Sequence, residues 1–224
     1  MADGRGGRKR SGKPCAGPHL ERLLWRIGIQ HVAGIDEVGM GPLAGPVVAA
    51  AVVLPPETTI AKVADSKQLT AAQRERLDVE IRARAIGIGI GIVEPDEIDR
   101  MNIYQAGMKA KRQALAALAP LVPGFVLVDG REIPGLGVPQ SAYPKGDAFV
   151  LSIAAASIVA KVFRDAIMRR LEEAHPGYGF GKHMGYATAF HLRAIESHGP
   201  SPVHRRSFSP IASDPQLPLE GLSR

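Results

Sequence analysis

The sequence predicts an α/β fold in which helices flank a mixed β-sheet. Two apolar runs, the second at Val47–Leu54, enclose a turn rich in glycine and proline, as in a β-hairpin. Residues 85–93 alternate isoleucine with glycine, and this period of two is typical of a strand. Helical stretches then alternate with a further apolar run, Phe125–Val128, so we expect hairpin-connected and helix-connected strands in one sheet.

The composition is that of a globular protein, with 45% hydrophobic and 22% charged residues. A length of 224 residues allows one domain, or at most two small ones. The single cysteine, Cys15, excludes an internal disulfide and a cysteine-rich zinc site.

The net charge of +6 and the pI near 9.7 favour an anionic partner such as nucleic acid, although much of this charge lies near the N-terminus. The sequence shows no apolar signal-peptide region, and its longest apolar run, Leu43–Leu54, is too short to cross a membrane. We therefore expect a cytoplasmic protein without a membrane partner.

Helical periodicity and capping residues predict several helices. Their expected ranges are 19–30, 71–85 with Thr70 as N-cap, a short helix from Pro95, 103–119 with Asn102 as N-cap, 148–174 and 188–198. Glycines 87, 89 and 91 share one face of their strand, which predicts that a helix or another backbone packs closely there. We assign Lys109, Lys111 and Arg112 to the polar face of their helix, and Asp165 to a surface ion pair.

The two ends of the chain lack the patterns of packed elements. Residues 1–18 mix arginine and lysine with glycine, serine and proline, so we expect a disordered basic tail. This tail either touches a phosphate backbone without sequence preference or is simply solvated. Residues 201–224, which include a basic patch at His204–Arg206, are expected to be irregular or disordered. Residues 19–200 are then the folded domain.

The stretch Val32–Pro46 has features of a metal site beside a phosphate. Its strand ends in two carboxylates, Asp36 and Glu37, and glycines 39, 41 and 45 follow at once. Magnesium and manganese prefer carboxylate oxygens, and glycine allows a ligand to approach the backbone closely. The same pattern also suits an ordinary polar strand end followed by a turn.

A second apolar strand ends in Asp129, and sites in such sheets form where strand ends meet. Asp129 alternatively begins an ordinary Asp-Gly turn, and Asp147 suits an N-cap of the long helix that follows it. Lys67 either contacts a phosphate or is a solvated loop lysine. The aromatic, basic segment Tyr178–Tyr186 either contacts sugars, bases and phosphates or is a packed connecting loop.

The order of these motifs resembles that of the bacterial ribonuclease HII family. The opening stretch matches the family signature Gly-Ile-Asp-Glu-Ala-Gly-Arg-Gly-Pro-Leu-Ala-Gly-Pro nearly residue for residue. Further motifs follow in the family's order: Asp65-Ser-Lys-Gln-Leu69, Val128-Asp-Gly130, Lys145-Gly-Asp147, residues 154–161, and Tyr178-Gly-Phe180 with residues 183–186. Together they cover about residues 20–200.

The resemblance implies a ribonuclease-H-like fold: a mixed β-sheet flanked by α-helices, with a C-terminal helical segment. It implies that two magnesium or manganese ions support phosphodiester hydrolysis. Their ligands, which are also the catalytic residues, are implied to be Asp36, Glu37, Asp129 and Asp147. A monomer is expected.

The implied partners are RNA in a hybrid with DNA and single ribonucleotides embedded in duplex DNA. The cut is expected on the 5′ side of the ribonucleotide, leaving a 3′-hydroxyl and a 5′-phosphate. An enzyme of this kind must detect the 2′-hydroxyl, which separates RNA from DNA. The substrate-binding positions that the resemblance implies are Gly39, Met40, Gly41, Lys67 and Tyr186.

Two positions depart from the family pattern. Met40 stands where the family has arginine, and Met184 stands where lysine usually precedes Gly-Tyr. Each departure replaces a cation with a neutral thioether close to the proposed substrate. We therefore expect an active enzyme that binds its substrate more weakly or with an altered junction preference.

Two kinds of alternative function compete with this one: a nucleic-acid-binding protein without strong catalysis, and a related nuclease of the same fold. A catalytically weak nucleic-acid-binding protein is disfavoured because all four carboxylates are present. A junction resolvase is disfavoured by the motifs after Asp65, and ribonuclease HIII by the lack of room for a large N-terminal substrate-binding domain. Asp165 is a further candidate for a carboxylate that supports the metal ligands from behind.

Overall fold

The computed structural model describes residues 16–61, 63 and 69–213. Within these ranges a five-stranded sheet has the order β3-β2-β1-β4-β5. The pairs β1–β2 and β2–β3 are antiparallel, whereas β1–β4 and β4–β5 are parallel. The predicted mixed sheet is therefore confirmed. Its strands are β1 (Val32–Val38), β2 (Val47–Val53), β3 (Gly87–Val93), β4 (Phe125–Asp129) and β5 (Gln140–Tyr143).

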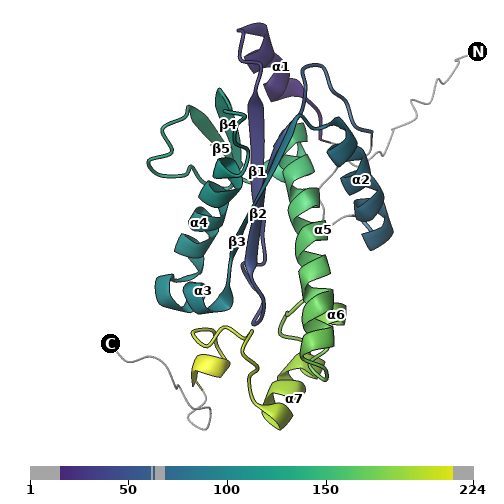
Figure 1. The fold of residues 1–224 in the computed structure, drawn as a ribbon, viewed down its shortest axis with the longest axis vertical. Coiled ribbons are helices and arrows are strands. Elements are labelled where there is room, and N and C mark those ends of the chain that lie inside the picture. The colour runs from purple at the N-terminus through teal and green to yellow at the C-terminus, as the bar shows by residue number, and fades with distance from the viewer. Residues whose placement is uncertain (1–15, 62, 64–68, 214–224) are drawn as a thin grey trace, which may run out of the picture.

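Helices cover both faces of this sheet (Figure 1). They are α1 (His19–Arg26), α2 (Ala71–Arg84), α3 (Pro95–Met101), α4 (Ile103–Ala116), α5 (Leu151–Ala174), α6 (Phe180–His183) and α7 (Ala189–His198), with 3-10 turns η2 (Gly146–Ala148) and η3 (Ile211–Ser213). The expected caps are also present, since the side chains of Thr70, Asn102 and Thr188 accept hydrogen bonds in the first turns of α2, α4 and α7.

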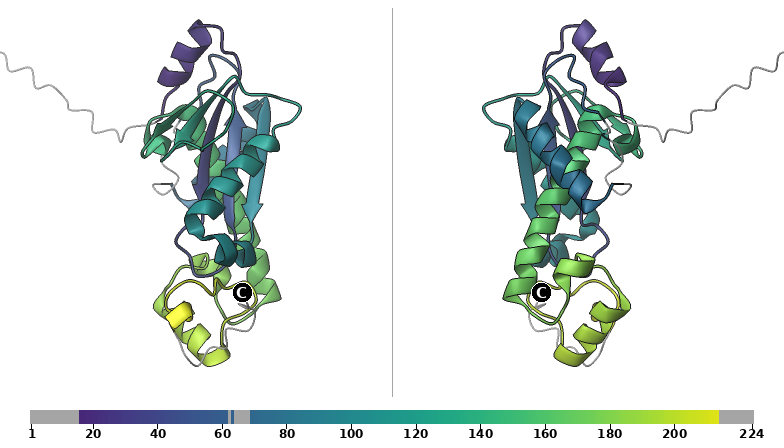
Figure 2. Two further views of the ribbon diagram at one scale, coloured as in Figure 1. Left: turned by 90° about the vertical axis from the view of Figure 1, so that its left-hand side faces the viewer. Right: turned by 90° about the vertical axis from the view of Figure 1, so that its right-hand side faces the viewer.

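The alternation of side chains along β2 explains the layers. Val48 and Val52 pack on the side of α5 and α2, whereas Val47 and Ala51 pack on the side of α4. The views in Figure 2 show α4 and α5 on opposite sides of the sheet. Because both faces of β2 are buried, its sequence is continuously apolar rather than alternating.

Glycine allows the helices to lie unusually close to the strands. A Cβ atom placed on Gly89 would lie 2.0 Å from the carbonyl oxygen of Ala114 in α4. On Gly34 of β1 it would lie 2.1 Å from the backbone carbonyl carbon of Ser152 in α5. Real Cβ contacts are never this short, so only glycine fits. The predicted close packing on the glycine face of β3 is confirmed.

Helix α5 begins at Leu151, three residues later than expected, and its N-cap is Val150 instead of Asp147. The first turn is capped from α1, because Glu21 Oε1 accepts hydrogen bonds from Ser152 N and Ser152 Oγ, both at 2.7 Å. Asp147, which lies in η2, is therefore not needed as a helix cap.

The structure differs from the sequence-based expectation at two further places. Strand β5 is missing from the predicted elements, because its four half-buried residues show no alternation of polar and apolar side chains. Residues 200–213 form mostly turns, as expected, but they pack tightly through buried Arg205 and Ile211. With α6 and α7 they lie beyond the lower end of β1 in Figure 1.

The predictions for residues 1–15 and 214–224 fall outside the described residues. No helix in the described part of the chain is both long enough and apolar enough to cross a membrane.

Substituting Gly89 with alanine should lower the free energy of unfolding by about 2 kcal/mol or more, because the new methyl group would push α4 away from β3. Urea denaturation followed by circular dichroism measures this change. Gly87→Ala is the matched control, since its Cβ would meet only the flexible side chains of Leu118 and Leu121, at 3.3 Å or more. Equal losses for the two variants would contradict the close approach of α4.

Candidate functional site

The four predicted carboxylates line one cavity of about 230 Å³ at the end of the sheet. The lining residues are Asp36, Glu37, Val38, Gly39, Met40, Gly41, Asp129, Asp147, Ser157 and Tyr186. Every site residue expected from the sequence is therefore in this cavity, except Lys67, which lies outside the described residues. Residues far apart in the chain meet here because β1, the end of β4, η2, α5 and the segment after α6 all contribute to the lining.

Strand pairing explains how three of these carboxylates come together. The parallel ladder of β1 and β4 runs to the pair Ile35–Val128, so Asp36 and Asp129 are the next residues on adjacent strands. Asp129 Oδ1 accepts a hydrogen bond from Gly146 N at 2.7 Å, which fixes η2 against the end of β4. Asp147 follows directly and thus faces the same cavity.

The surroundings of Asp36 oppose the ionisation of its carboxyl group. Burial raises its pKa well above the usual range, and the neighbouring charges of Glu37 and Asp129 raise it further. A hydrogen bond from Ser157 and the charge of Lys111 act in the opposite direction. The cavity thus contains negative charge that a bound cation would stabilise.

Lys111 is the residue of the site that the sequence analysis misplaced. It was assigned to the polar face of α4, but it is only 1% exposed. Its Nζ lies 2.7 Å from Glu37 Oε2 and donates to the carbonyl oxygen of Asp129 at 2.8 Å. The sequence did contain a sign of this burial. Lys111 follows Gly107 by four residues, so it lies on the same side of the helix as Gly107, beside the alanine stripe.

The donor set fits divalent magnesium or manganese, because the titratable groups lining the cavity, apart from Tyr186, are carboxylates. In the described part of the chain, no three acidic, histidine or cysteine side chains are arranged to hold one ion together. In this structure Lys111 pairs with Glu37, and the backbone N–H groups of Glu37 and Gly146 donate to Asp36 and Asp129. The four carboxylates are the side chains of this cavity that could hold such an ion.

Two buried arginines bind the turn between β1 and β2. Arg164 donates to the carbonyl oxygens of Pro46 at 2.9 Å and Ala44 at 3.1 Å. Arg205 donates to those of Gly39 at 2.6 Å, Gly45 at 2.8 Å and Met40 at 3.3 Å. Burial lowers the pKa of Arg164 to about 10 and that of Arg205 to about 9, so both remain cations at neutral pH.

The arginine contacts determine which way the turn presents its amides. A trans peptide points its carbonyl and its N–H in opposite directions. Because Arg205 binds the carbonyls of Gly39 and Met40, the N–H groups of Met40 and Gly41 point away from it. Gly39 has φ +92° and leaves no room for a Cβ, which would lie 2.4 Å from Arg164 Nε. The turn therefore needs glycine at this position.

Tyr186 stands at the mouth of the cavity. Its side chain is 48% exposed, and a Cβ placed on Gly41 would lie 3.7 Å from its Cε1. Its carbonyl oxygen accepts hydrogen bonds from Thr188 N and His191 Nδ1 at 2.8 and 2.9 Å. The ring is thus free to contact a ligand while the backbone behind it is held.

A chain of histidines supports Tyr186 from inside. Ser201 N donates to His204 Nδ1, so the other ring nitrogen of His204 carries the proton. His204 Nε2 then donates to His191 Nε2 at 2.9 Å, and His191 Nδ1 donates to Tyr186 O. Both rings must be neutral, in agreement with burial, which lowers the pKa of His191 and lowers that of His204 to about 3.

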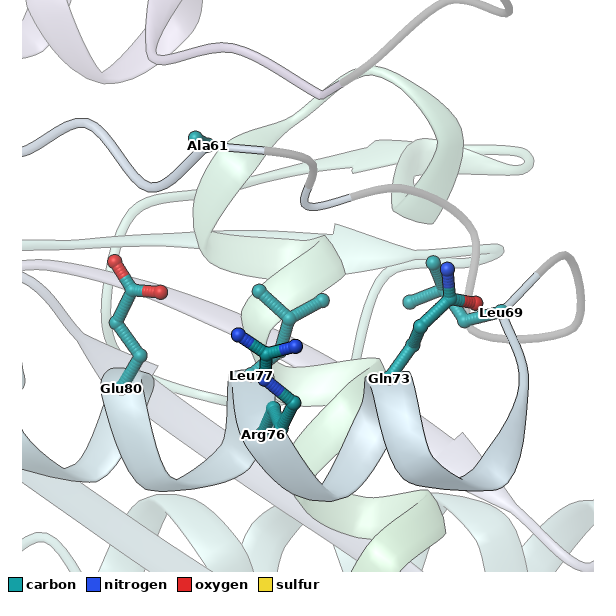
Figure 3. Close-up of a pocket in the computed structure, with 6 residues that line it drawn as sticks. All are labelled: Ala61, Leu69, Gln73, Arg76, Leu77 and Glu80. Carbon is teal, nitrogen blue, oxygen red and sulfur yellow. The ribbon is translucent and has the colours of Figure 1, made fainter.

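Another cavity, of about 360 Å³, lies between α2 and the segment that follows β2 (Figure 3). Its lining residues are Ala61, Leu69, Gln73, Arg76, Leu77 and Glu80. It is larger than the carboxylate cavity, but its two charged groups are of opposite sign and reach solvent. This cavity therefore lacks the cluster of carboxylates that lines the other one.

Three further expectations can be compared with the structure. Asp165 forms the expected ion pairs, with Lys161 at 2.7 Å and Arg74 at 3.9 Å, but it is buried rather than on the surface. It does not line the carboxylate cavity. Met40 lines that cavity with its side chain packed against Gly107, whereas Met184 packs among the apolar residues near α6.

Lowering the pH should destabilise the protein through His204. The unfolded histidine binds a proton below about pH 6.5, while the folded one stays neutral down to about 3. Its contribution to stability is therefore complete above pH 6.5 and is lost as the pH falls, by up to about 1.4 kcal/mol per pH unit. Urea unfolding in EDTA between pH 7.5 and 5 measures this loss.

The control for this measurement is His204→Gln. The glutamine amide can accept from Ser201 and donate to His191, but it does not titrate in this range. The variant should therefore lose less stability than the wild type over the same pH interval. Parallel profiles for the two proteins would contradict the neutral state assigned to His204.

Comparison with known proteins agrees with this geometry. The family model described as "Ribonuclease HII" matches residues 33–211, which contain the four carboxylates, the turn and the buried arginines. A ribonuclease HII of Nitrosococcus oceani is 54% identical over 182 residues, covering 81% of this chain and 90% of the relative. One from an Anaeromyxobacter species is 49% identical over 207 residues, covering 91% of this chain but 65% of the relative.

A solved structure shows the same fold. The crystal structure of ribonuclease H2 from Pyrococcus horikoshii is similar with a TM-score of 0.69 and 27% identity, covering 82% of this chain and 96% of that one. The match of the family model extends over most of the sequence and over every element that builds the cavity. The chain therefore belongs to the ribonuclease HII family of nucleases.

Proposed function

We propose that this protein is an endonuclease that hydrolyses the RNA strand of RNA–DNA hybrids and cuts on the 5′ side of ribonucleotides embedded in duplex DNA. The products would carry a 3′-hydroxyl and a 5′-phosphate. The observation that carries this proposal is the single cavity in which four carboxylates, a glycine turn and an exposed tyrosine meet. Carboxylates suit the metal ions of such a reaction, and the turn and the tyrosine suit recognition of a ribose.

The carboxylates have separate roles in this proposal. We assign Asp36, which is buried beside Glu37 and Asp129, as the ligand that two magnesium or manganese ions would share. Glu37, Asp129 and Asp147 complete the two sets of ligands. When bound, the ions lower the pKa of the attacking water and stabilise the leaving oxygen. The protein keeps the carboxylates in place through strand pairing and through the Gly146 N–H that binds Asp129.

Recognition of the ribonucleotide is assigned to the turn and to Tyr186. The N–H groups of Met40 and Gly41 point away from Arg205, so they are available to bind oxygen atoms of the substrate. The Tyr186 ring beside Gly41 is suited to pack against a sugar, and its hydroxyl to make a polar contact. DNA lacks the 2′-hydroxyl and would leave these groups without a partner, which is a strong basis for discrimination.

Replacing Asp36 with asparagine tests the proposed enzyme directly. A labelled DNA duplex with one ribonucleotide is incubated with magnesium or manganese, and the products are separated on a sequencing gel. We expect one cut on the 5′ side of the ribonucleotide by the wild type and a loss of at least about 100-fold in the variant. Binding of the duplex in EDTA should be almost unchanged, because the substitution keeps the shape of the side chain.

An all-DNA duplex is the control for specificity and should remain intact. A protein that binds the ribonucleotide duplex but does not cut it with either metal would contradict the proposed activity. That result would favour the alternative of a nucleic-acid-binding protein without catalysis.

Restoring the cations at positions 40 and 184 should strengthen substrate binding. We expect Met40→Arg with Met184→Lys to lower KM roughly threefold or more, with kcat little changed, because a cation near a phosphate adds a charge-assisted hydrogen bond. Met40→Arg alone should give most of the effect, since Met40 lines the cavity and Met184 packs elsewhere. Unchanged kinetics on hybrid and embedded-ribonucleotide substrates would show that the turn acts through its backbone alone.

A further inference from the structure

The side chain of Lys111 ends inside a group of carboxylates. Its side chain is buried and extends from α4 into the site. Its Nζ contacts two atoms there, Glu37 Oε2 and the carbonyl oxygen of Asp129. Within the described residues, Glu37 Oε2 is buried and accepts no hydrogen bond, so its partner is the charge of Lys111 in the ion pair. One of the two oxygens of a predicted metal ligand is thus occupied by a charge that belongs to the protein.

The surroundings of Lys111 place its charge against a predicted metal ligand, Glu37. A third cavity, of about 320 Å³, is lined by Glu37, Asp129, Met40, Gly107, Lys111 and Arg131 among others. Met40 fills the space above Gly107 with a neutral side chain. Lys111 therefore faces two carboxylate-bearing residues and an apolar thioether, and its closest negative partner is the metal ligand itself.

We propose that Lys111 is a built-in counter-ion of the metal centre, which stabilises the metal-free protein and competes with divalent cations for Glu37. This inference rests on the proposed metal-dependent function. Four carboxylates confined in one cavity repel one another, and a buried ammonium offsets part of this repulsion. The same ammonium repels an incoming divalent ion and occupies the oxygen that the ion requires, because charges in a buried site are poorly screened.

Lys111 is a positioning residue in this scheme. A substrate phosphate that entered with the metal would add negative charge, which would favour the metal ions over Lys111 as the partner of Glu37. The structure therefore points to an enzyme that holds metal weakly on its own and more tightly in the substrate complex.

The test is a calorimetric titration of the metal-free full-length protein with Mn²⁺ in the absence of nucleic acid. Lys111→Met removes the charge and keeps a side chain of similar length, and we expect it to bind Mn²⁺ roughly tenfold more tightly than the wild type. Lys109→Met is the matched control, because Lys109 lies on the same helix but pairs with Glu97 at the surface. Its Mn²⁺ affinity should stay within about twofold of the wild type.

Thermal unfolding provides a second reading of the same idea. In EDTA, Lys111→Met should melt at a lower temperature than the wild type, and saturating Mn²⁺ should raise its Tm by more than it raises that of the wild type. Lys111→Gln is made in parallel, since its amide can still donate to the Asp129 carbonyl without carrying charge, and it should also bind Mn²⁺ more tightly. Unchanged or weaker Mn²⁺ binding by both folded variants would overturn the proposal.

The outcome for Lys111 can be separated from the outcome for the proposed function. If the wild-type protein cuts the ribonucleotide duplex but both variants bind Mn²⁺ no more tightly, the proposed function is supported and the proposed role of Lys111 is overturned. If the wild-type protein does not cut the duplex but both variants bind Mn²⁺ more tightly, the proposed nuclease reaction is overturned and the proposed role of Lys111 is supported.

Discussion

The turn between β1 and β2 is held by two buried guanidinium groups, and the arrangement of the site depends on this contact. Arg164 comes from α5 and Arg205 from the segment after α7, yet both bind carbonyl oxygens of the same turn. Buried carbonyl groups must find donors, and an arginine supplies several from one rigid plane. The turn thereby becomes a fixed surface that lines the cavity beside the carboxylates, and the N–H groups of Met40 and Gly41 point away from Arg205.

The second constraint is the balance of charge in that cavity. Asp36 is buried beside Glu37 and Asp129, and such a group is costly to ionise without a cation nearby. Lys111 supplies part of the compensation from within the protein, and we propose that metal ions supply the rest. Both cations would act on the same carboxylate, so the affinity for metal and the stability of the metal-free fold are linked through Glu37.

The C-terminal segment connects recognition to the rest of the domain. Helix α7 and the residues after it place His191 and His204 in a neutral hydrogen-bonded chain that ends on the carbonyl of Tyr186. The same segment contributes Arg205, so one packed unit supports both Tyr186 and the glycine turn. A ligand that bridges the turn and the tyrosine would therefore contact two parts of a single support.

The sequence by itself determined the class of fold, most helices and strands, and the carboxylates and glycines of the site, because these depend on periodicity, caps and short motifs. It also contained the family signature that identified the metal ligands as candidates. Only the tertiary structure decided the burial of Lys111, the contacts of Arg164 and Arg205, and the cap that Glu21 gives to α5. The reason is physical: whether a long charged side chain is buried or solvated depends on partners that are distant in the sequence, and only the folded chain brings those partners to its charged group.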